Sequence, residues 1–283
     1  MQWMTALGEC RAERRPAVLV TVAQVRGHAP RRAGAKMVVA ADRVWDTIGG
    51  GNLEAVAIDR ARQMLRDGTG EPDLVQISLS DRAPLQFGVQ CCGGEVSLML
   101  DPMPVSAAVA VFGLGHVGLE LARILARHDL DLTLVDSREE QLRPERLAVL
   151  DDAVATVHVR HEPITPENAI ADLPAGAHVL VMTHDHAEDI AICDAALRAE
   201  HLGSIGLIGS SAKWARFTRV LTREHGHDRE ELQRIKIPIG HPEIAGKEPA
   251  VIALSVAADL VVRMTAEPGV GAERSVAAAQ DEE

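Results

Sequence analysis

The sequence predicts a two-domain α/β protein, with a domain of mixed strands and helices followed by a doubly wound parallel sheet. From residue 107 onward, apolar strand-like runs alternate with amphipathic stretches, which is the pattern of strand–helix units on a parallel sheet. Before that point strands predominate. Asp101-Pro102-Met103-Pro104 separates the two regions, and its prolines predict a linker. We therefore expect domains at 1–103 and 104–266, and a disordered polar tail at 267–283.

Composition excludes several classes of function. The 283 residues are 47% hydrophobic but only 2% aromatic, and their net charge of −12 disfavours binding to nucleic acid. No apolar run approaches the ~20 residues of a membrane-spanning helix, and residues 1–4 do not begin an export signal. Four cysteines in a chain this long do not form a disulfide scaffold. We expect a cytoplasmic protein without nucleic-acid or membrane partners.

In the N-terminal domain, short β-branched runs predict strands and one longer stretch predicts a helix. The helix opens at Gly49-Gly50-Gly51-Asn52 and continues to about Arg66, because its apolar residues recur at helical spacing. A turn-rich basic loop, residues 26–32, follows the first strand. The strands are expected at Ala17–Val25, Lys36–Ala40, Val44–Ile48, Leu74–Leu79 and Glu95–Leu100.

In the C-terminal domain, buried-strand runs alternate with helical patterns. The strands are expected at Ala107–Phe112, Leu132–Val135, Val154–Val159, Ala177–Thr183 and Ser204–Ile208. The helices are expected at Gly115–Arg127, Ala187–Glu200, Ser211–His225 and Pro249–Thr265. Such a succession buries the strands between two layers of helices.

The glycine motif Gly113-Leu114-Gly115-His116-Val117-Gly118 lies between the first strand and first helix of this domain. In such a turn the first glycine permits the bend, the second lets a pyrophosphate approach the backbone, and the third allows close helix packing. Free N–H groups at the helix start favour an anion near His116. Asp136 ends the second strand at about the separation expected of a ribose-binding carboxylate. The motif predicts a Rossmann-like nucleotide site, although the fold can also persist as a scaffold without a ligand.

Two further segments follow later strands, where open α/β sheets bind ligands. Thr183-His184-Asp185-His186 offers groups for a metal or a proton transfer, but capping of the next helix by Thr183 or Asp185 is favoured, because no third and fourth metal ligand follow at a typical spacing. In Gly206–Lys213, Ser210 can cap a helix, and Lys213 can face an anion. Arg216 and Arg219 continue the row from Lys213, and a solvated helix face explains all three as well.

The first domain carries an unusual sulfur motif, Gln90-Cys91-Cys92-Gly93-Gly94. A thiolate there can ligate a soft metal or attack an electrophilic sulfur, whereas two small buried apolar residues are the simpler interpretation. The glycines Gly49, Gly50 and Gly51 open a helix and form a second candidate anion cradle. Three arginines of the basic loop can contact a phosphate or can simply be solvated: Arg26, Arg31 and Arg32.

With these motifs in view, the whole chain resembles the XdhC/CoxI family of molybdenum-cofactor accessory proteins. The resemblance follows the expected order along nearly the entire sequence. It rests on residues 18–30 (VLVTVAQVRGHAP), 47–54 (TIGGGNLE), 89–95 (VQCCGGE), 113–118 (GLGHVG), 182–186 (MTHDH), 206–217 (GLIGSSAKWARF) and 237–256 (IPIGHPEIAGKEPAVIALSV).

The resemblance implies a chaperone rather than an enzyme. Such a protein holds molybdopterin-type cofactor as cargo, presents it to a cysteine desulfurase for sulfuration, and hands it to an apo-xanthine dehydrogenase of purine metabolism. It implies Cys91 and Cys92 as candidate molybdenum contacts, without deciding between them, and a homodimer. No catalytic residue is expected, because no nucleophile elbow is evident. An NAD(P)-dependent oxidoreductase and a nucleotide-sensing module stay open as alternatives, because both would use the glycine loop.

Overall fold

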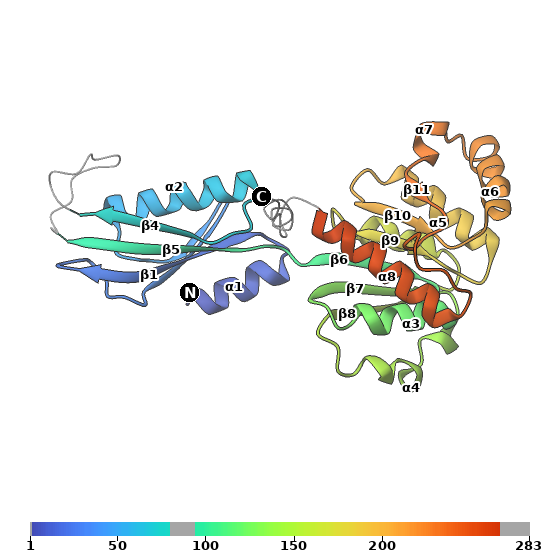
Figure 1. The fold of residues 1–283 in the computed structure, drawn as a ribbon, viewed down its shortest axis with the longest axis horizontal. Coiled ribbons are helices and arrows are strands. Elements are labelled where there is room, and N and C mark those ends of the chain that lie inside the picture. Colours follow the sequence, from blue (N-terminus) through green and yellow to red (C-terminus); the bar gives the residue numbers. More distant parts are fainter. Residues whose placement is uncertain (1, 80–93, 267–283) are drawn as a thin grey trace, which may run out of the picture. The chain divides into compact units, whose positions relative to one another are not determined.

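The computed structural model describes residues 2–79 and 94–266, and it divides the chain into two compact units (Figure 1). The described part of the first unit comprises residues 2–79, 94–105 and 265–266, and the second unit spans Ser106–Met264. The predicted α/β class is confirmed: the first unit contains an antiparallel sheet with helices, and the second a six-stranded parallel sheet. The tail predicted at 267–283 lies outside the described residues.

The first unit is a five-stranded antiparallel sheet in the order β3-β2-β1-β5-β4. Its strands are β1 (Ala17–Arg26), β2 (Lys36–Ala40), β3 (Val44–Asp46), β4 (Asp73–Ser78) and β5 (Glu95–Met103). Its helices are α1 (Trp3–Ala12) and α2 (Gly51–Asp67). Side chains alternate across the sheet, so Val18 and Val20 belong to the core under α2, whereas Ala17 belongs to the smaller cluster under α1.

Helix α2 buries one stripe of small and medium apolar residues, at Leu53, Ala57, Ala61 and Met64. Their spacing of three and four residues places them on a single face of the helix. The helix ends at Gly68, whose left-handed conformation (φ 64°) suits a residue without Cβ.

Two features of the first unit differ from the sequence predictions. The predicted linker at Asp101–Pro104 is wrong for its first three residues, because β5 continues to Met103 and Pro102 lies opposite Val18 of β1. Strand β4 begins opposite Leu100, so one flank of β5 has no strand neighbour at Pro102, and an edge position tolerates a proline. Helix α1 was not predicted, since its ten residues combine only weak amphipathicity with a buried pair, Ala6 and Cys10.

The second unit is a six-stranded parallel sheet in the order β11-β10-β9-β6-β7-β8. Its strands are β6 (Ala107–Phe112), β7 (Leu130–Asp136), β8 (Thr156–His161), β9 (His178–Val181), β10 (Ser204–Leu207) and β11 (Ile235–Lys236). Its α-helices are α3 (His116–Leu125), α4 (Pro144–Leu147), α5 (His186–Arg198), α6 (Ser211–Arg223), α7 (Arg229–Leu232) and α8 (Pro249–Ala266), and short 3-10 turns include η3 (Pro166–Asp172). Numbered from β6, the order is that of dinucleotide-binding sheets.

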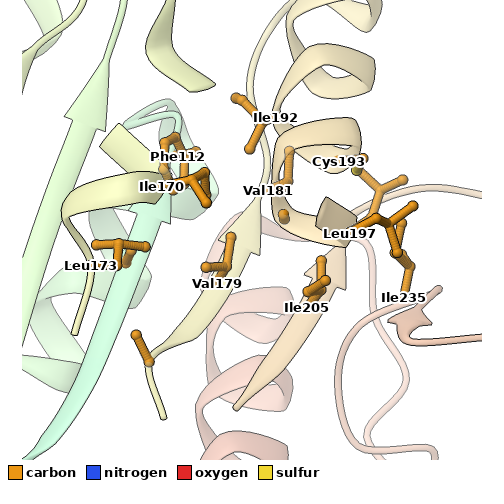
Figure 2. Packing of buried hydrophobic residues seen from close by; sticks show 14 of the residues in the cluster. Phe112, Ile170, Leu173, Val179, Val181, Ile192, Cys193, Leu197, Ile205 and Ile235 are labelled. Carbon is orange, nitrogen blue, oxygen red and sulfur yellow. The ribbon is translucent and has the colours of Figure 1, made fainter. Parts of the chain in front are cut away.

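Helices cover both faces of this sheet. On one face α5, α6 and η3 pack against β6, β9 and β10, and Figure 2 shows Ile192, Cys193 and Leu197 of α5 over Val181 and Ile205. On the other face α3 and α8 bury Leu121, Leu125, Val256 and Leu260 against β6 and β7. The central strands are therefore apolar on both sides, as the continuous hydrophobic runs predict.

Within the part of the chain that the structure describes, no helix has both the length and the apolar character needed to cross a bilayer.

Candidate functional site

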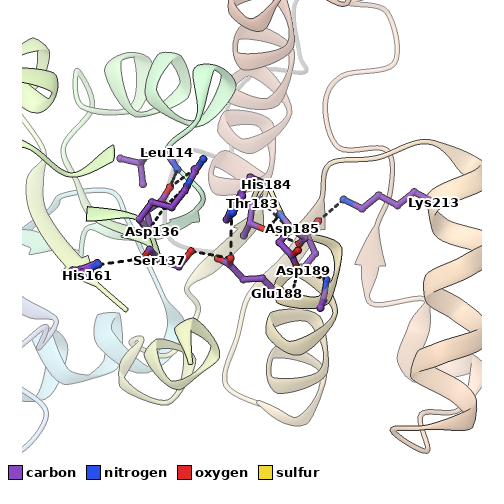
Figure 3. Close-up of polar contacts among 12 residues, drawn as sticks. Leu114, Asp136, Ser137, His161, Thr183, His184, Asp185, Glu188, Asp189 and Lys213 are labelled. Carbon is purple, nitrogen blue, oxygen red and sulfur yellow. Dashed lines mark hydrogen bonds and ion pairs between the residues drawn. The ribbon is translucent and has the colours of Figure 1, made fainter. Parts of the chain in front are cut away.

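The second unit has its topological switch point at the carboxyl end of β6. Strand β7 pairs with one side of β6 and β9 with the other, so the chain leaves β6 in opposite directions for its two neighbours. At such a point the loops after adjacent strands separate and leave a crevice. Figure 3 shows the polar contacts that gather there, between the Leu114 backbone after β6 and polar side chains from the loops after β7 and β9 and from α5 and α6.

The three glycines of the loop after β6 have different surroundings. Gly113 has φ 99°, and a Cβ on it would lie 2.5 Å from the Met182 carbonyl oxygen. A Cβ on Gly118 would lie 2.0 Å from the Gly113 carbonyl oxygen. Gly115, which caps α3, would place a Cβ in open space with nothing within 4 Å, and the following His116 is exposed. The first and third glycines are therefore required by packing, and the second borders a space that a ligand can occupy.

Asp136, the expected ribose acceptor, is saturated by groups of the protein. Its carboxylate accepts four hydrogen bonds: one from the Leu114 N–H (2.6 Å) and three from the backbone N–H, Nε and Nη2 of Arg138 (2.9 Å each). A carboxylate has about four lone-pair sites, so none is left for a ligand hydroxyl. Burial raises the pKa of Asp136, but the hydrogen bonds from Arg138 and Leu114 outweigh it, and the pKa lies below its ordinary value. In this structure Asp136 anchors the glycine loop.

Arg146 of α4 holds the next peptide group of the loop, because its Nη2 donates to the Leu114 carbonyl oxygen at 3.0 Å. Both arginines that support the glycine loop were missed by the sequence analysis. Arg138 follows Asp136 by two residues, so the pair Asp-x-Arg at a strand end is a signal that could have identified it. Arg146 is more than 25 residues from the loop, and only the tertiary fold brings it there.

The loop after β9 is built by helix capping, so the capping interpretation of this motif is confirmed. Asp185 accepts hydrogen bonds from the Ala187 and Glu188 N–H groups at the start of α5, and these bonds lower its pKa. Thr183 donates its N–H and its hydroxyl to the buried carboxylate of Asp189. His184 stays exposed. Throughout residues 2–79 and 94–264 no group of three or more His, Cys, Asp or Glu side chains is arranged to hold a metal ion.

Lys213 turns inward and is not free for an anion. Its ammonium group donates to Asp189 Oδ2 (2.6 Å) and to the Ile208 carbonyl oxygen (2.8 Å), with its side chain 13% exposed. Ser210 caps α6 through the Lys213 N–H, as predicted. Arg216 and Arg219 lie exposed, so the three cations do not share one environment. The Lys213–Asp189 pair is a buried tie between α5 and α6.

Glu188 of α5 spans the switch point. Its Oε2 accepts a hydrogen bond from Ser137 Oγ (3.0 Å), and His184 Nδ1 lies 3.8 Å away (Figure 3). Ser137 follows β7 and Glu188 follows β9, so this bond crosses the carboxyl end of β6. Burial raises the pKa of Glu188 above its ordinary value. In sequence, a glutamate in the first turn of a helix indicates a cap. Nothing in the sequence indicates its hydrogen bond with Ser137, 51 residues earlier.

In the first unit, the basic loop contacts Gly49, just before α2, and Gly94, the last residue of the sulfur motif. A Cβ on Gly94 would lie 2.2 Å from the His28 carbonyl oxygen and 2.8 Å from that of Arg26. A Cβ on Gly49 would lie 2.4 Å from Pro30 Cβ. The basic loop 26–32 therefore packs against both the start of α2 and the last glycine of the sulfur motif. Gln90, Cys91, Cys92 and Gly93 themselves lie outside the described residues.

The expected anion cradle at Gly49–Gly51 is largely filled by the protein. Glu54 Oε2 accepts hydrogen bonds from the Thr47 hydroxyl (2.5 Å), the Ile48 N–H (3.3 Å) and the Gly50 N–H (3.1 Å). The Gly49 N–H donates to Thr47 Oγ1 at 3.0 Å. A carboxylate of α2 thus takes the place that an external anion would have, and the prediction of an open cradle is corrected for Gly49 and Gly50. The exposed side chains of Arg26, Arg31 and Arg32 lie on the neighbouring loop.

Comparison with known proteins matches both units. Residues 109–260 match the model described as the XdhC Rossmann domain, and residues 10–78 match the XdhC and CoxI family. The chain is 28% identical over 274 residues to the molybdenum cofactor insertion chaperone PaoD of Escherichia coli, covering 86% of this chain and 82% of that protein.

Two further similarities concern a longer protein and a solved structure. The chain is 26% identical over 254 residues to the Escherichia coli protein YqeB; the match covers 90% of this chain and spans 44% of that protein. A crystal structure described as a xanthine dehydrogenase from Bacillus halodurans superposes with a TM-score of 0.47 at 18% identity, covering 94% of this chain and 97% of that one.

Proposed function

Because this chain belongs to the XdhC/CoxI family, we propose that it binds molybdenum cofactor, protects it, supports its sulfuration and delivers it to an apo-molybdoenzyme of the xanthine dehydrogenase type. The similarity to a molybdenum cofactor insertion chaperone over 86% of the chain supports this role. The cargo carries a phosphate, a polar pterin and a molybdenum–dithiolene centre. A carrier for it needs a cation for the phosphate and a soft ligand for the metal.

The observation that carries the proposal is the packing of the basic loop in the first unit. Gly94 packs on the Arg26 and His28 carbonyl groups, and in sequence Gly94 follows the two cysteines by two and three residues. Arg31 and Arg32 on the same loop are exposed, and the described part of the chain provides no carboxylate partner for either. In a chain of net charge −12, arginines without a carboxylate partner among the described residues, on a loop that Gly94 contacts, suit an anionic cargo. By sequence, the two cysteines shortly before Gly94 supply the soft ligand that a metal needs.

The test of delivery is co-expression of an apo-dehydrogenase with and without this chain, measuring molybdenum content, terminal sulfur and activity. We expect all three to fall without the chain, and equal values in both cultures would refute the proposal. A cysteine desulfurase supplied in the same cells separates sulfuration from insertion, because only terminal sulfur depends on it.

The test of binding uses purified protein loaded with molybdenum cofactor. We expect Cys91→Ala or Cys92→Ala to reduce the bound molybdenum strongly. The double variant Arg31→Ala, Arg32→Ala should weaken binding roughly tenfold, which corresponds to the free energy of about one charge-assisted hydrogen bond. Cys10→Ala is the matched control for the thiols, because Cys10 is a buried cysteine of the same unit. If all these variants retain full binding, the cargo lies elsewhere.

The crevice of the second unit favours a second ligand, a nucleotide. The strand order and the open space before Gly115 fit a pyrophosphate on the glycine loop. We propose that this crevice binds a nucleotide such as NAD(P), for sensing or for hydride transfer. Titration of NADH and NADPH by fluorescence, followed by a screen for turnover, separates a sensing module from an oxidoreductase, and no binding of either refutes both.

A further inference from the structure

Four carboxylates belong to the polar network at the switch point (Figure 3), and they differ in what they can still accept. Asp136 is saturated by Leu114 and Arg138, as described above. Asp189 is fully buried, and its two oxygens are taken by Thr183 and Lys213. A ligand hydroxyl can therefore donate to neither of them without breaking an internal network, which leaves a buried group unsatisfied.

Of the two other carboxylates, Asp185 is the N-cap of α5 and Glu188 lies in its first turn. Asp185 is exposed at the rim, where its Oδ1 caps the helix. An exposed hydrogen bond there competes with water and adds little. Glu188 is only 12% exposed, accepts a hydrogen bond from Ser137 on one oxygen, and keeps acceptor capacity on the other. Of the four, Glu188 alone combines partial burial with acceptor sites that a ligand can use.

The Glu188 carboxylate also lies where a ligand bound at the switch point would contact it. The Ser137–Glu188 hydrogen bond joins the loop after β7 to the first turn of α5, which follows β9, and β7 and β9 flank β6. A ligand that lies along the crevice with a phosphate near Gly115 passes this bond. A hydroxyl group has the same donor chemistry as Ser137 Oγ, so it can replace the serine on the carboxylate.

We infer that Glu188, and not Asp136, is the carboxylate that recognises the ribose hydroxyls of a nucleotide in this crevice, with Ser137 as the internal group that the ligand displaces. This inference rests on the proposed nucleotide binding. It assigns ribose recognition to a carboxylate in the first turn of α5 instead of the carboxylate at the end of β7. Ligands that lack hydroxyl donors at this position should bind poorly, because the Ser137–Glu188 bond is then broken without replacement.

The test is a fluorescence titration of the full chain with NADH. Glu188→Ala should bind NADH about 10- to 100-fold more weakly, the loss of a hydrogen bond to a charged group. Ser137→Ala should bind NADH about 2- to 10-fold more tightly, because the ligand no longer displaces an internal donor. A serine with only a structural role would not produce this gain. Glu200→Ala is the matched control, an exposed glutamate after the end of α5, and it should bind like the wild type.

The outcomes distinguish a failure of this inference from a failure of the nucleotide-binding proposal on which it rests. NADH binding that is unchanged in Glu188→Ala, or a Ser137→Ala variant that binds no more tightly than the wild type, overturns the inference while the nucleotide proposal stands. No binding of NADH to the wild type overturns both. If Glu188→Ala does not fold, as judged by its thermal unfolding, the Ser137→Ala titration decides alone.

Discussion

Replacement of Arg138 by methionine tests whether Asp136 is a structural anchor of the glycine loop. The substitution keeps most of the apolar stem and removes the guanidinium, which donates to both oxygens of Asp136 at 2.9 Å. The carboxylate keeps its bonds from the Leu114 and Arg138 backbone N–H groups. It stays buried, at 2% exposure, with a charge that has lost its partner.

The expected loss follows from these contacts. Removal of one member of a buried ion pair costs ~3–5 kcal/mol, and each charge-assisted hydrogen bond contributes ~1.5–3 kcal/mol. The Arg138 side chain is 24% exposed, so water can replace part of the interaction. We therefore expect a loss of about 2–4 kcal/mol in the free energy of unfolding of the second unit, or roughly 5–15 °C in its Tm.

The assay can report the second unit alone. Of the three tryptophans, Trp3 and Trp45 belong to the first unit and Trp214 to α6, so a Trp3→Phe, Trp45→Phe background leaves Trp214 as the probe in urea unfolding. The matched control is Arg127→Met, which breaks the exposed pair with Asp152 and should cost less than ~1 kcal/mol. Equal losses in the two variants would refute the assignment of Asp136 as a buried anchor.

A pH series adds a second readout with a definite sign. Because the pKa of Asp136 is lowered in the fold, its contribution to stability is fully present above the ordinary value of 3.8 and is lost as the pH falls through the folded pKa. Without the guanidinium the folded pKa rises, so Arg138→Met should lose stability at a higher pH than the wild type. The stability difference between the two proteins should then shrink in acid. A difference that does not change with pH would show that Asp136 is not its cause.

Three further predictions concern other parts of the chain. Gly118→Ala should prevent normal folding of the second unit, because its Cβ would lie 2.0 Å from a carbonyl oxygen. Gly115→Ala should fold normally and weaken NADH binding, because a Cβ there meets no atom of the protein within 4 Å. Circular dichroism measures the folding of both variants and titration measures their NADH binding, and equal stability of the two would contradict the packing argument. Glu54→Ala should destabilise the first unit by ~1–3 kcal/mol in urea unfolding, since the N–H groups before α2 lose their acceptor, and no change would mean that water replaces it. Asp194→Ala should cost ~1–3 kcal/mol by the same measurement with Trp214 as the probe, because the buried His227 loses its 2.6 Å partner, and a loss as small as that of Arg127→Met would contradict this.

The sequence was sufficient for five of the six strands of the second unit, for its four longer helices and for the glycine turn, whereas the short elements β11, α4 and α7 were not predicted. Local pattern decides these features: apolar runs predict buried strands, and the spacing of Gly113, Gly115 and Gly118 predicts the turn between β6 and α3. Helix capping by Asp185 and Ser210 was also predictable, since the capping side chain and the N–H groups it satisfies are neighbours in sequence. The linker predicted at Pro102 was wrong because an edge strand tolerates a proline that an interior strand does not. Other boundaries moved by about two residues, as for β8, which was predicted at Val154–Val159 and lies at Thr156–His161.

Only the tertiary structure decided which candidate groups are free to bind a ligand. Asp136, Lys213 and the N–H groups of Gly49 and Gly50 all have ligand-binding chemistry in sequence, and in the fold each is satisfied by another group of the protein. Conversely, Glu188 has no sequence signal beyond a helix start, yet it spans the switch point. Hydrogen-bond capacity is limited, and partners such as Ser137 and Glu188 lie 51 residues apart, so the allocation of donors to acceptors is a property of the folded chain.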